Sequence, residues 1–477
     1  MVNALKSETR EEIVDSIGLV ILAGGEGKRL KLNVPKPLAP IRSKKLIDFP
    51  LRVCFDFLGD KNGIVSVVVG HRREEVESHV KSLFPNTIFA IQKEQKGTAD
   101  ALKSYFNDVQ SASKQKYTAV ICADTPMLTV EEVEVLYKNL ITRNLDAVAA
   151  TFQVENPKGY GRIVRGSKGF SIVEEKDATP EQKFINEVNS GLYFFKTEYI
   201  LKHINQIDSK NASSEFYLTD LFKSDRNVEA ILFQDSFKFF GVNDLVQLGD
   251  MEKKMNKEKI KRLIENGVYF IDRSQVYIEE DVNVAPGVTI YPNVFLHGKT
   301  EIQSGCIIEV GSVIKDSILS KSVHIKAYSY IEKAKIDDDA TIGPFAHLRP
   351  DSQIGTKSKI GNFVETKNVI LHKGVKVSHL SYVGDAEVGD DSNLGCGFIT
   401  CNYDGAKKHK TKIGKGCFIG SDSQMIAPLT IGDECYVASG STINQDMPSG
   451  SFAIARERQV TKEGMARRFI KTKESSK

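Results

Sequence analysis

Aliphatic residues recur every six positions through the second half of the 477-residue chain, and this period restricts the fold more than any other feature. The positions form three runs: Val284, Ile290, Leu296, Ile302, Ile308 and Ile314; Ile342, Leu348, Ile354 and Ile360; and Ile413, Ile419, Met425, Ile431, Val437 and Ile443. An α-helix repeats near 3.6 residues and a half-buried strand near two, so neither explains a period of six. Short strands joined by tight corners do explain it, if each strand points one aliphatic side chain inward. The pattern therefore predicts a parallel β-helix of hexapeptide repeats, whose coils must stack to bury their apolar faces.

Length and composition predict a soluble globular protein with more than one domain. A chain of 477 residues exceeds one ordinary hydrophobic core. Its formal net charge of +3 is too small to indicate a nucleic-acid or membrane partner. The leading residues lack the apolar core of a secretion signal, and no apolar run is long enough to span a membrane. Seven cysteines without C-x-x-C pairs favour reduced thiols and a cytoplasmic location.

Strand-like and helix-like stretches alternate in the first half of the chain. Apolar strand-like runs occupy residues 17–22, 64–70 and 118–123, and amphipathic helix-like stretches occupy 74–84 and 130–139. This alternation is typical of an α/β domain with a Rossmann-like mixed sheet that is largely parallel. Ligands of such sheets bind at the carboxyl ends of the strands.

Helical spacing of apolar residues from 244 to about 266, followed by Gly267, predicts a helix that connects two domains. The repeats themselves run from about residue 277 to 445. The sequence thus predicts four parts: an α/β domain at 17–243, a linker helix at 244–267, a β-helix domain at 268–455 and a basic tail at 456–477.

A glycine-rich loop, AGGEGKRL, follows the first predicted strand and precedes the run PKPL. Glycines let backbone N–H groups approach a phosphate closely, and Arg29 and Lys36 supply positive charge. The loop is neither a Walker loop nor a G-x-G-x-x-G dinucleotide motif. A glycine turn with surface cations remains the alternative interpretation.

Several motifs carry a resemblance to a known family. AGGEGKRL with PKPL resembles the signature of sugar-nucleotide pyrophosphorylases. The segments QKEQKGTADAL, ICADTPML, NPKGYGRIVR, IVEEKDAT, NEVNSGLYFF and EFYLTD occur in the order found in the bacterial bifunctional enzymes of UDP-N-acetylglucosamine synthesis. Those enzymes fuse an N-acetylglucosamine-1-phosphate uridylyltransferase to a glucosamine-1-phosphate N-acetyltransferase. In the second half of this chain, five segments resemble the acetyltransferase half of those enzymes: GPFAHLRP, GNFVETKN, SHLSYVGDAEVG, ITCNYDGAKKHKT and FIGSDSQMIAP.

The resemblance implies that the first half joins a sugar 1-phosphate to UTP and releases pyrophosphate. Asp124 and Asn243 would hold Mg²⁺, while Arg29 and Lys36 would stabilise charge on the triphosphate. The other implied contacts to UTP and the sugar are Leu22, Ala23, Gly24, Gly25, Gln92, Gly97, Thr98, Gly161, Glu174 and Asn189. Without the resemblance, Asp124 is equally a helix N-cap and Asn243 a turn or cap residue.

The resemblance also implies that the second half transfers acetyl from acetyl-CoA to glucosamine 1-phosphate. His379 would be the general base that keeps the attacking amine neutral, although a lone histidine is more often structural. The implied contacts to the sugar phosphate are Arg349, Lys367, Tyr382 and Asn393. The implied contacts to acetyl-CoA are Cys396, Asn402, Tyr403, Ser421, Ser439 and Arg456. The lysines of AKKHKTK either meet the cofactor's phosphates or belong to a solvated loop.

In this family the coil is a left-handed parallel β-helix, and the chains form homotrimers along it. The resemblance implies the same hand and the same assembly for this chain, with only small molecules as further partners. Two rival interpretations stay open at this point. In one, the chain is a single-activity sugar-nucleotide pyrophosphorylase whose coil serves oligomerisation alone. In the other, the two folds form a non-catalytic scaffold.

Overall fold

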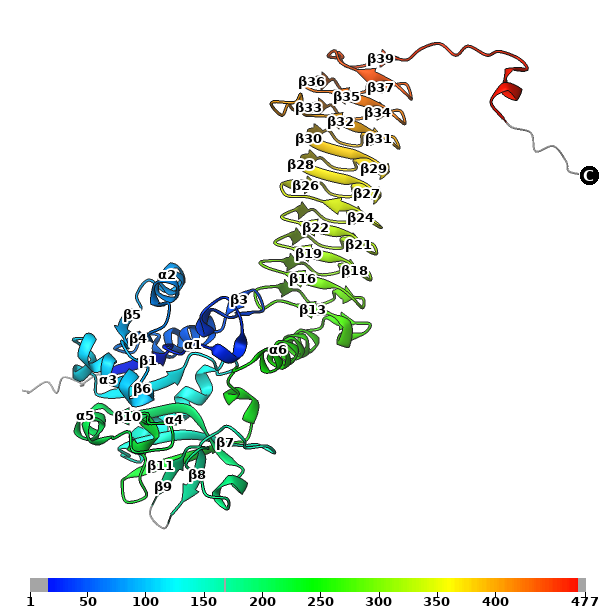
Figure 1. Ribbon diagram of the computed structural model, residues 1–477. Helices are drawn as coiled ribbons and strands as arrows, with labels where there is room; N and C mark the ends of the chain where they lie inside the picture. Colours follow the sequence, from blue (N-terminus) through cyan, green and yellow to red (C-terminus); the bar gives the residue numbers. More distant parts are fainter. Residues whose placement is uncertain (1–15, 167–168, 471–477) are drawn as a thin grey trace, which may run out of the picture. The chain divides into compact units, whose positions relative to one another are not determined.

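The computed structural model describes residues 16–166 and 169–470, and the chain divides into two compact units with the boundary between Met255 and Asn256 (Figure 1). Within these described ranges, no helix is both long and apolar enough to cross a membrane.

A mixed β-sheet forms the centre of the first unit (Figure 1). Its strands follow the order β11 (Val228–Phe233), β7 (Ala147–Gln153), β10 (Glu187–Lys196), β6 (Tyr117–Cys122), β1 (Ile17–Leu22), β4 (Gly63–Val69) and β5 (Ile88–Ile91). Strand β10 runs antiparallel to both of its neighbours, and the other adjacent pairs are parallel. Strands β8 (Arg162–Arg165) and β9 (Phe170–Val173) extend the sheet beside β10, and β2 (Pro40–Ile41) pairs with β3 (Lys44–Lys45).

Helices cover both faces of this sheet because successive side chains of its strands point to opposite sides. On β1, Leu19 and Ile21 belong to one core and Val20 to the other. The first core packs against α1 (Asp48–Leu58), α2 (Arg73–Leu83) and α4 (Val130–Thr142). The second core packs against α3 (Thr98–Asp108) and α5 (Thr197–His203). The predicted α/β architecture is therefore present, with α1 and α3 as helices that were not predicted.

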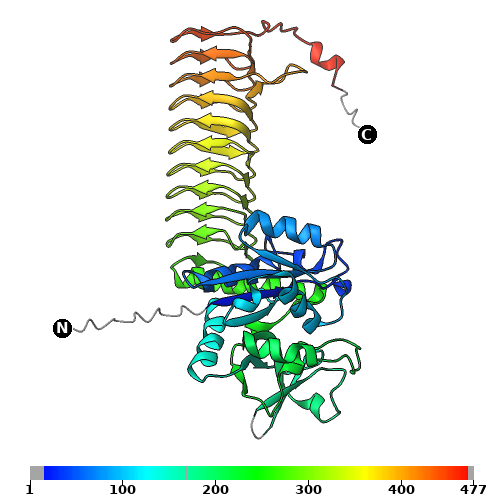
Figure 2. The same ribbon diagram turned by 90° about the vertical axis from the view of Figure 1, so that its left-hand side faces the viewer.

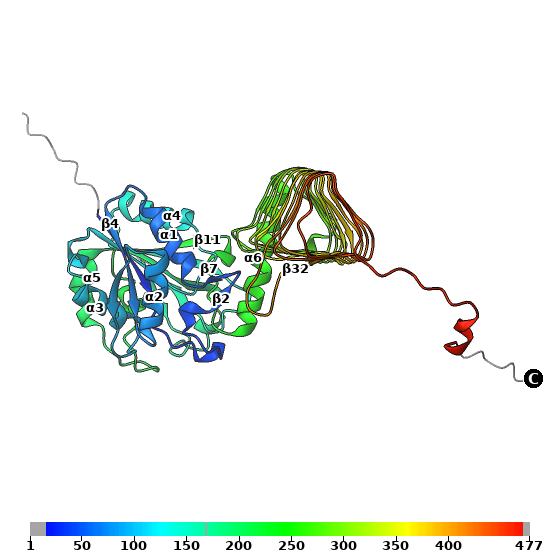
Figure 3. The ribbon, with the colours of Figure 1, turned by 90° about the horizontal axis from the view of Figure 1, so that it is seen from above.

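The second unit is a parallel β-helix, seen from the side in Figure 2 and along its axis, with a triangular cross-section, in Figure 3. One face consists of β12 (Tyr269–Phe270), β15 (Thr289–Ile290), β18 (Ile307–Ile308), β21 (His324–Ile325), β24 (Thr341–Ile342), β27 (Lys359–Asn362), β29 (Lys376–His379), β31 (Asn393–Leu394), β34 (Phe418–Ile419), β37 (Tyr436–Val437) and β39 (Phe452–Ala453).

The other two faces share one sheet, in which β28 (Glu365–Leu371) and β30 (Tyr382–Val388) run from one face to the next. One of these faces also contains β13 (Tyr277–Ile278), β16 (Phe295–His297), β19 (Val313–Lys315), β22 (Tyr330–Glu332), β25 (His347–Leu348), β32 (Ile399–Cys401), β35 (Gln424–Ile426) and β38 (Thr442–Ile443). The other contains β14 (Asn283–Val284), β17 (Glu301–Ile302), β20 (Ile318–Leu319), β23 (Lys335–Ile336), β26 (Ser352–Ile354), β33 (Thr411–Ile413) and β36 (Leu429–Ile431).

The period-six prediction is confirmed at every position it named. Each aliphatic residue lies in a strand of the coil, and all are buried except the half-buried Val284. The period lapses between the predicted runs because some coils are one residue shorter: Leu296 pairs with Ile314, but Ile314 pairs with Ile331. Threonine also replaces the inward aliphatic residue at Thr366 and Thr400.

Helix α6 (Leu245–Glu265) occupies the segment predicted as the linker. Leu248, Met251 and Met255 belong to a core of the first unit, whereas Ile260 and Leu263 belong to the core of the coil. The helix ends before Gly267, whose φ of +88° is a left-handed conformation that favours glycine.

Candidate active sites

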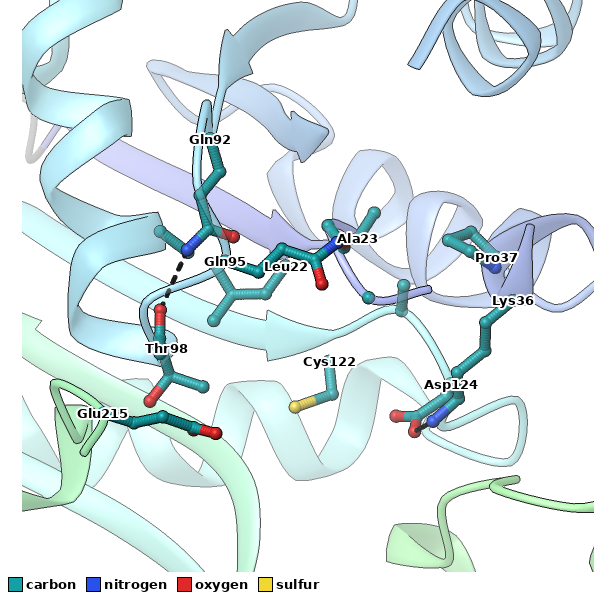
Figure 4. A pocket seen from close by; sticks show the side chains of 15 residues that line it. Leu22, Ala23, Lys36, Pro37, Gln92, Gln95, Thr98, Cys122, Asp124 and Glu215 are labelled. Atoms are coloured by element: carbon teal, nitrogen blue, oxygen red, sulfur yellow. Dashed lines mark hydrogen bonds and ion pairs between the residues drawn. The ribbon is translucent and has the colours of Figure 1, made fainter. Parts of the chain in front are cut away.

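A cavity of about 330 Å³ opens at the carboxyl ends of β1 and β6 in the first unit (Figure 4). Many of the residues predicted to bind UTP or the UDP-sugar line it, namely Leu22, Ala23, Gly24, Gly25, Lys36, Gln92, Gly97 and Thr98, and so does the predicted metal ligand Asp124. The structure therefore brings together residues from four distant segments of the sequence, as a ligand site at the edge of an α/β sheet requires.

Lys36 lies between two side-chain oxygen atoms at one end of this cavity. Its Nζ donates to Asp124 Oδ2 at 2.5 Å and to Asn243 Oδ1 at 2.8 Å. Arg29 Nη2 donates to the same Asn243 oxygen at 3.1 Å. Two cations thus converge on a carboxylate and an amide, a combination that suits phosphate groups and a cation that accompanies them.

Local structure fixes Lys36 in this position. Lys36–Leu38 form a short 3₁₀ helix that begins after Pro35 and contains Pro37. Gly27 approaches so closely that a Cβ there would lie 2.6 Å from Lys36 Cβ, and its φ is +71°. Only glycine satisfies both conditions, so the close packing of Lys36 against the loop requires a glycine at this position.

The alternative interpretation of Asp124 and Asn243 as helix caps is wrong. Helix α4 is capped by Thr129, whose capping box with Glu132 satisfies its first turn. Asn243 uses its side-chain oxygen for Lys36 and Arg29, and it is Asp244 that accepts from the Gln247 N–H in the first turn of α6. Neither side chain caps a helix, and Asp124 lines the cavity.

Gln92, Gly97 and Thr98 form the opposite end of the cavity. Gln92 Nε2 donates to Gly97 O at 3.0 Å and to Asp100 Oδ2 at 2.9 Å, which fixes the orientation of its amide. The Thr98 hydroxyl accepts from the Leu218 N–H at 3.0 Å. Gly97 has a φ of +112° and lies against the backbone of Phe216, where no side chain fits. An amide held in one orientation can read the polar edge of a base.

Gly161, Glu174 and Asn189 also gather, outside the residues that line this cavity. Asn189 N–H donates to Gly161 O at 2.9 Å, and a Cβ on Gly161 would lie 3.5 Å from Glu174 Oε2. Asn189 Nδ2 donates to the buried Tyr193 hydroxyl at 2.6 Å. Burial raises the pKa of Glu174, although a hydrogen bond from Thr219 opposes that rise.

Sequence reasoning missed several residues that line the cavity: Pro37, Gln95, Ala101 and Glu215. Gln95 Nε2 donates to Gly24 O at 2.5 Å, so it supports the glycine-rich loop. Its place within the motif QKEQKGTADAL was a usable signal. Glu215 comes from an irregular stretch and only the fold places it here. Cys122 also lines the cavity, and burial raises its pKa to about 12, so this thiol is not an activated nucleophile.

In the second unit, His379 is the last residue of β29, at the corner that leads to β30. Its Nδ1 is 2.7 Å from Oδ1 of Asn362, the residue beneath it in the ladder. When Nδ1–H donates to that oxygen, Nε2 keeps its lone pair free to accept a proton. The structural alternative for His379 is a core histidine, but its side chain is exposed.

Most of the predicted acetyl-CoA contacts form a column above His379. Backbone bonds connect the successive corners: Gly397 N–H donates to Leu380 O, Asp422 N–H to Cys396 O and Gly440 N–H to Ser421 O. A Cβ on Gly420 would meet Ser439, and one on Gly440 would meet the Arg456 side chain. The coil thus stacks Cys396, Ser421, Ser439 and Arg456, which are far apart in sequence, along one edge.

Three cations meet on the adjacent face. Arg349 N–H donates to Thr366 O, which places Arg349 one coil below Lys367. The pKa of Lys367 is lowered because Lys408 lies within hydrogen-bond reach and Arg349 adds a second like charge. Arg349 is also paired with Glu365 at 2.8 Å, directly beneath Tyr382. Asn393 lies on the neighbouring face, in β31.

Asn402 and Tyr403 begin an insertion between β32 and β33. Asn402 is buried, with 8% of its surface exposed, and its Nδ2 donates to Asp385. Tyr403 is exposed and its hydroxyl donates to Gly405 O at 2.6 Å. The lysines of this insertion differ in their surroundings, because Lys408 faces Lys367 while Lys410 is paired with Glu387 at 2.9 Å.

Comparison with known proteins finds similarity over almost the whole chain. Residues 19–238 match a family described as nucleotidyl transferase, and residues 410–445 match bacterial transferase hexapeptide (six repeats). The relatives named bifunctional protein GlmU include one from Trichlorobacter lovleyi, 40% identical over 451 residues that cover 93% of this chain and 97% of the relative. Those from Syntrophotalea carbinolica and Clostridioides difficile are 41% and 39% identical and cover 96% and 99% of their own lengths.

Proposed function

The chain belongs to the family of bifunctional GlmU proteins, and we propose which of its residues carry out the two reactions. It is a bifunctional enzyme of UDP-N-acetylglucosamine synthesis, as the sequence motifs predicted. The N-acetyltransferase activity uses acetyl-CoA and glucosamine 1-phosphate, and the uridylyltransferase activity uses UTP and N-acetylglucosamine 1-phosphate. The predicted fold is also confirmed: a nucleotidyltransferase domain precedes a left-handed parallel β-helix of hexapeptide repeats.

The uridylyl transfer takes place in the first unit, at the end of the cavity where Lys36 meets Asp124 and Asn243. Lys36 and Arg29 bind the triphosphate and neutralise the charge that develops on it. Gln92, with the backbone near Gly97, holds the uracil. Gly161, Glu174 and Asn189 hold the N-acetyl sugar. The sugar phosphate oxygen attacks the α-phosphorus directly, so these residues act by positioning and need no protein nucleophile.

Asp124 and Asn243 are suited to hold Mg²⁺. The Lys36 ammonium already lies between their oxygens, so a cation fits between these two groups. No cluster of three or more acidic, histidine or cysteine side chains suited to a metal occurs among the described residues. Two protein ligands are enough for Mg²⁺, since it binds one or two protein oxygens and completes its coordination shell with phosphates and water. When bound, it neutralises phosphate charge and aligns the reacting oxygens.

The acetyl transfer takes place at the coil corner that carries His379. His379 Nε2 accepts a proton from the ammonium of glucosamine 1-phosphate, so that the neutral amine attacks the thioester. Arg349 and Lys367 bind the sugar's phosphate, and Tyr382 and Asn393 hydrogen-bond to the sugar. The acetyl-CoA site comprises Cys396, Asn402, Tyr403, Ser421, Ser439 and Arg456. The acetyl group passes directly from the thioester to the amine, so no acetyl-cysteine intermediate on Cys396 is formed.

The assembly, location and domain limits belong to the same proposal. The chain forms a homotrimer through the β-helix, acts in the cytoplasm and requires neither nucleic acid nor a membrane. Its domains are 17–243, the linker 244–267, the β-helix 268–455 and the tail 456–477. Light scattering on the purified protein measures the mass of the assembly, and a monomer would contradict the trimer.

One observation carries the residue assignment: Lys36, Asp124 and Asn243 meet in the first unit although they are distant in sequence. A scaffold has no use for that convergence, and an oligomerisation coil has no use for the His379–Asn362 pair. The test follows CoA thiol and pyrophosphate on the purified protein with Mg²⁺. His379→Ala should remove only the first product and Asp124→Ala only the second. If either substitution leaves its product unchanged, that residue's role is wrong.

A further inference from the structure

The insertion that interrupts the coil forms a hairpin, residues 402–410, which we call the insertion hairpin. It leaves the stack of strands after β32 and returns at β33 (Figure 2). Tyr403 pairs with Lys408 in an antiparallel bridge, and the His409 N–H donates to Asn402 O at 2.8 Å. Inside it, Asp404 is 2.6 Å from the His409 ring. These bonds give the hairpin its own shape, but they do not attach it to the coil.

Two carboxylates of a single strand, β30, attach the hairpin at its two ends. At the entry, Asp385 Oδ2 accepts from Asn402 Nδ2 at 2.5 Å, while Oδ1 accepts from Asn368 Nδ2 at 2.5 Å. Both oxygens of Asp385 are therefore engaged. At the exit, Glu387 Oε2 accepts from Lys410 Nζ at 2.9 Å.

Glu387 has a second partner, and its electrostatics agree with a held carboxylate. Its Oε1 lies 3.3 Å from His372 Nε2, on the coil below. Hydrogen bonds from Lys410 and then from His372 lower the pKa of Glu387. The Glu387 carboxylate is thus charged at neutral pH, which strengthens the hydrogen bond that it accepts from Lys410.

The backbone ladder above β30 has a gap at Asp385 and resumes before Glu387. Strand β30 pairs with β32 at Tyr382 and with β33 only from Ala386 onward. Between these points the Thr400 hydroxyl accepts from the Gly384 N–H and donates to the Gly384 carbonyl. The entry of the hairpin therefore depends on the Asp385 side chain for its attachment to the coil, while at the exit a backbone hydrogen bond from the Leu429 N–H to Lys410 O lies beside the Glu387–Lys410 pair.

We propose that Asp385 and Glu387 are positioning residues of the acetyltransferase, which hold the two ends of the insertion hairpin and so fix Asn402 and Tyr403 for acetyl-CoA. This inference rests on the proposed role of Asn402 and Tyr403. Asp385 acts through the Asn402 amide, and Glu387 acts through Lys410. Neither carboxylate touches the reacting atoms.

Limited trypsin digestion measures the attachment directly, since the hairpin contains Lys407 and Lys408. The variants are Asp385→Ala and Glu387→Ala. The matched control is Glu332→Ala, which removes the partner of Lys315 at 3.2 Å on lower coils of the same unit. Cleavage after Lys407 or Lys408, identified by mass, should be at least about fivefold faster in the two variants than in the control. Equal rates would overturn the proposal.

Steady-state kinetics test the consequence for acetyl-CoA. Each variant should raise KM for acetyl-CoA by about tenfold and leave kcat within about twofold, because the hairpin binds the cofactor without taking part in proton transfer. Lys410→Ala should match Glu387→Ala, and the double variant should be no worse than either. Uridylyl transfer by the same samples should be unchanged, which excludes general unfolding.

The outcomes separate the inference from the proposed function. A wild-type protein that never releases CoA would show that the proposed function fails, and the role of the two carboxylates fails with it. An active wild-type protein whose variants keep its KM would overturn the inference alone. A fall in kcat with an unchanged KM would also overturn it, because that result would place these residues in the chemical step.

Discussion

Lys36 Nζ lies 2.5 Å from Asp124 Oδ2, although 88 positions separate the two residues in the chain. Lys36 comes from a proline-flanked turn after the glycine-rich loop, and Asp124 follows the neighbouring strand β6. Because β1 and β6 are adjacent and parallel, the segments after them meet at one edge of the sheet. The Lys36 ammonium therefore lies where the proposed reaction places the triphosphate.

Replacement of Lys36 should abolish one activity and spare the other. Lys36→Met removes the fixed charge, and we expect uridylyl transfer to fall by about 10²–10³-fold, as for other groups that stabilise developing charge. Acetyl transfer should stay within about twofold. The measurement compares pyrophosphate and CoA thiol release from one preparation, with Lys138→Met as an exposed control in the same unit. Equal loss of both products would indicate misfolding.

Removal of divalent metal should have the same selectivity. With EDTA in excess, pyrophosphate release should stop, because Asp124 and Asn243 would then hold no divalent cation to neutralise the phosphate charge. CoA release should continue, since the proposed acetyl transfer uses His379 and no metal. Added Mg²⁺ should restore the first activity in the wild type and much less in Asp124→Asn. Pyrophosphate release that persists in EDTA would contradict the proposal.

The His379–Asn362 pair predicts a graded loss of acetyl transfer. His379→Ala should lower kcat by about 10²–10⁴-fold, the usual contribution of a general base. Asn362→Ala keeps the imidazole but frees its orientation, so we expect a smaller fall of about 10–100-fold. Asn283→Ala, an exposed asparagine on a distant coil, serves as the control. CoA release by Asn362→Ala at the wild-type rate would show that the pair does not orient the base.

Glu174 should make the first unit less stable at neutral pH. Burial raises its pKa, so its neutral form favours folding below its unfolded pKa of about 4.3, and that contribution is lost as the pH rises through its folded pKa. Glu174→Gln should therefore unfold at higher urea concentration than the wild type at pH 7, and the difference should vanish near pH 4. Its KM for N-acetylglucosamine 1-phosphate should rise. A difference that grows toward low pH would reverse the sign of this argument.

Replacing a buried aliphatic side chain inside the coil with alanine should lower the stability of the second unit. Ile342 is fully buried between Ile325 and Ile360 in the ladder. Ile342→Ala should lower the free energy of unfolding by about 2–5 kcal/mol, which combines lost burial with the cavity left behind. Lys359→Ala, an exposed neighbour, should change it by less than about 0.5 kcal/mol. Urea unfolding monitored by circular dichroism measures both, and equal values would contradict the inward assignment.

Much of the fold could be predicted from the sequence because local geometry imposes a visible period. Residues such as Ile342 and Ile419 recur at six because a coil corner returns the chain to the same inward position. Coils that are one residue shorter interrupt this six-residue period, and polar inward-facing residues such as Thr366 make it harder to recognise. Helices α1 and α3 were not predicted, although their buried residues follow a helical period as clear as that of α2 and α4.

Some residues of the candidate sites could likewise be predicted from the sequence, and others could not. Motifs identified Lys36, Asp124 and His379 because those segments resemble a family. The partners Asn362, Asp385 and Glu387 belong to no pattern of their own, and Glu215 comes from an irregular stretch. Their importance depends on which strand lies beside which.

The sequence alone therefore determined the β-helix, the α/β domain, the family and most of the proposed site residues. These depend on periods and motifs that short stretches of chain carry by themselves. Only the tertiary structure decided that Lys36 lies between Asp124 and Asn243, that Asn362 contacts His379 and that one strand holds both ends of the insertion hairpin. Hydrogen bonds act over about 3 Å, and the packing of distant segments sets which groups come that close.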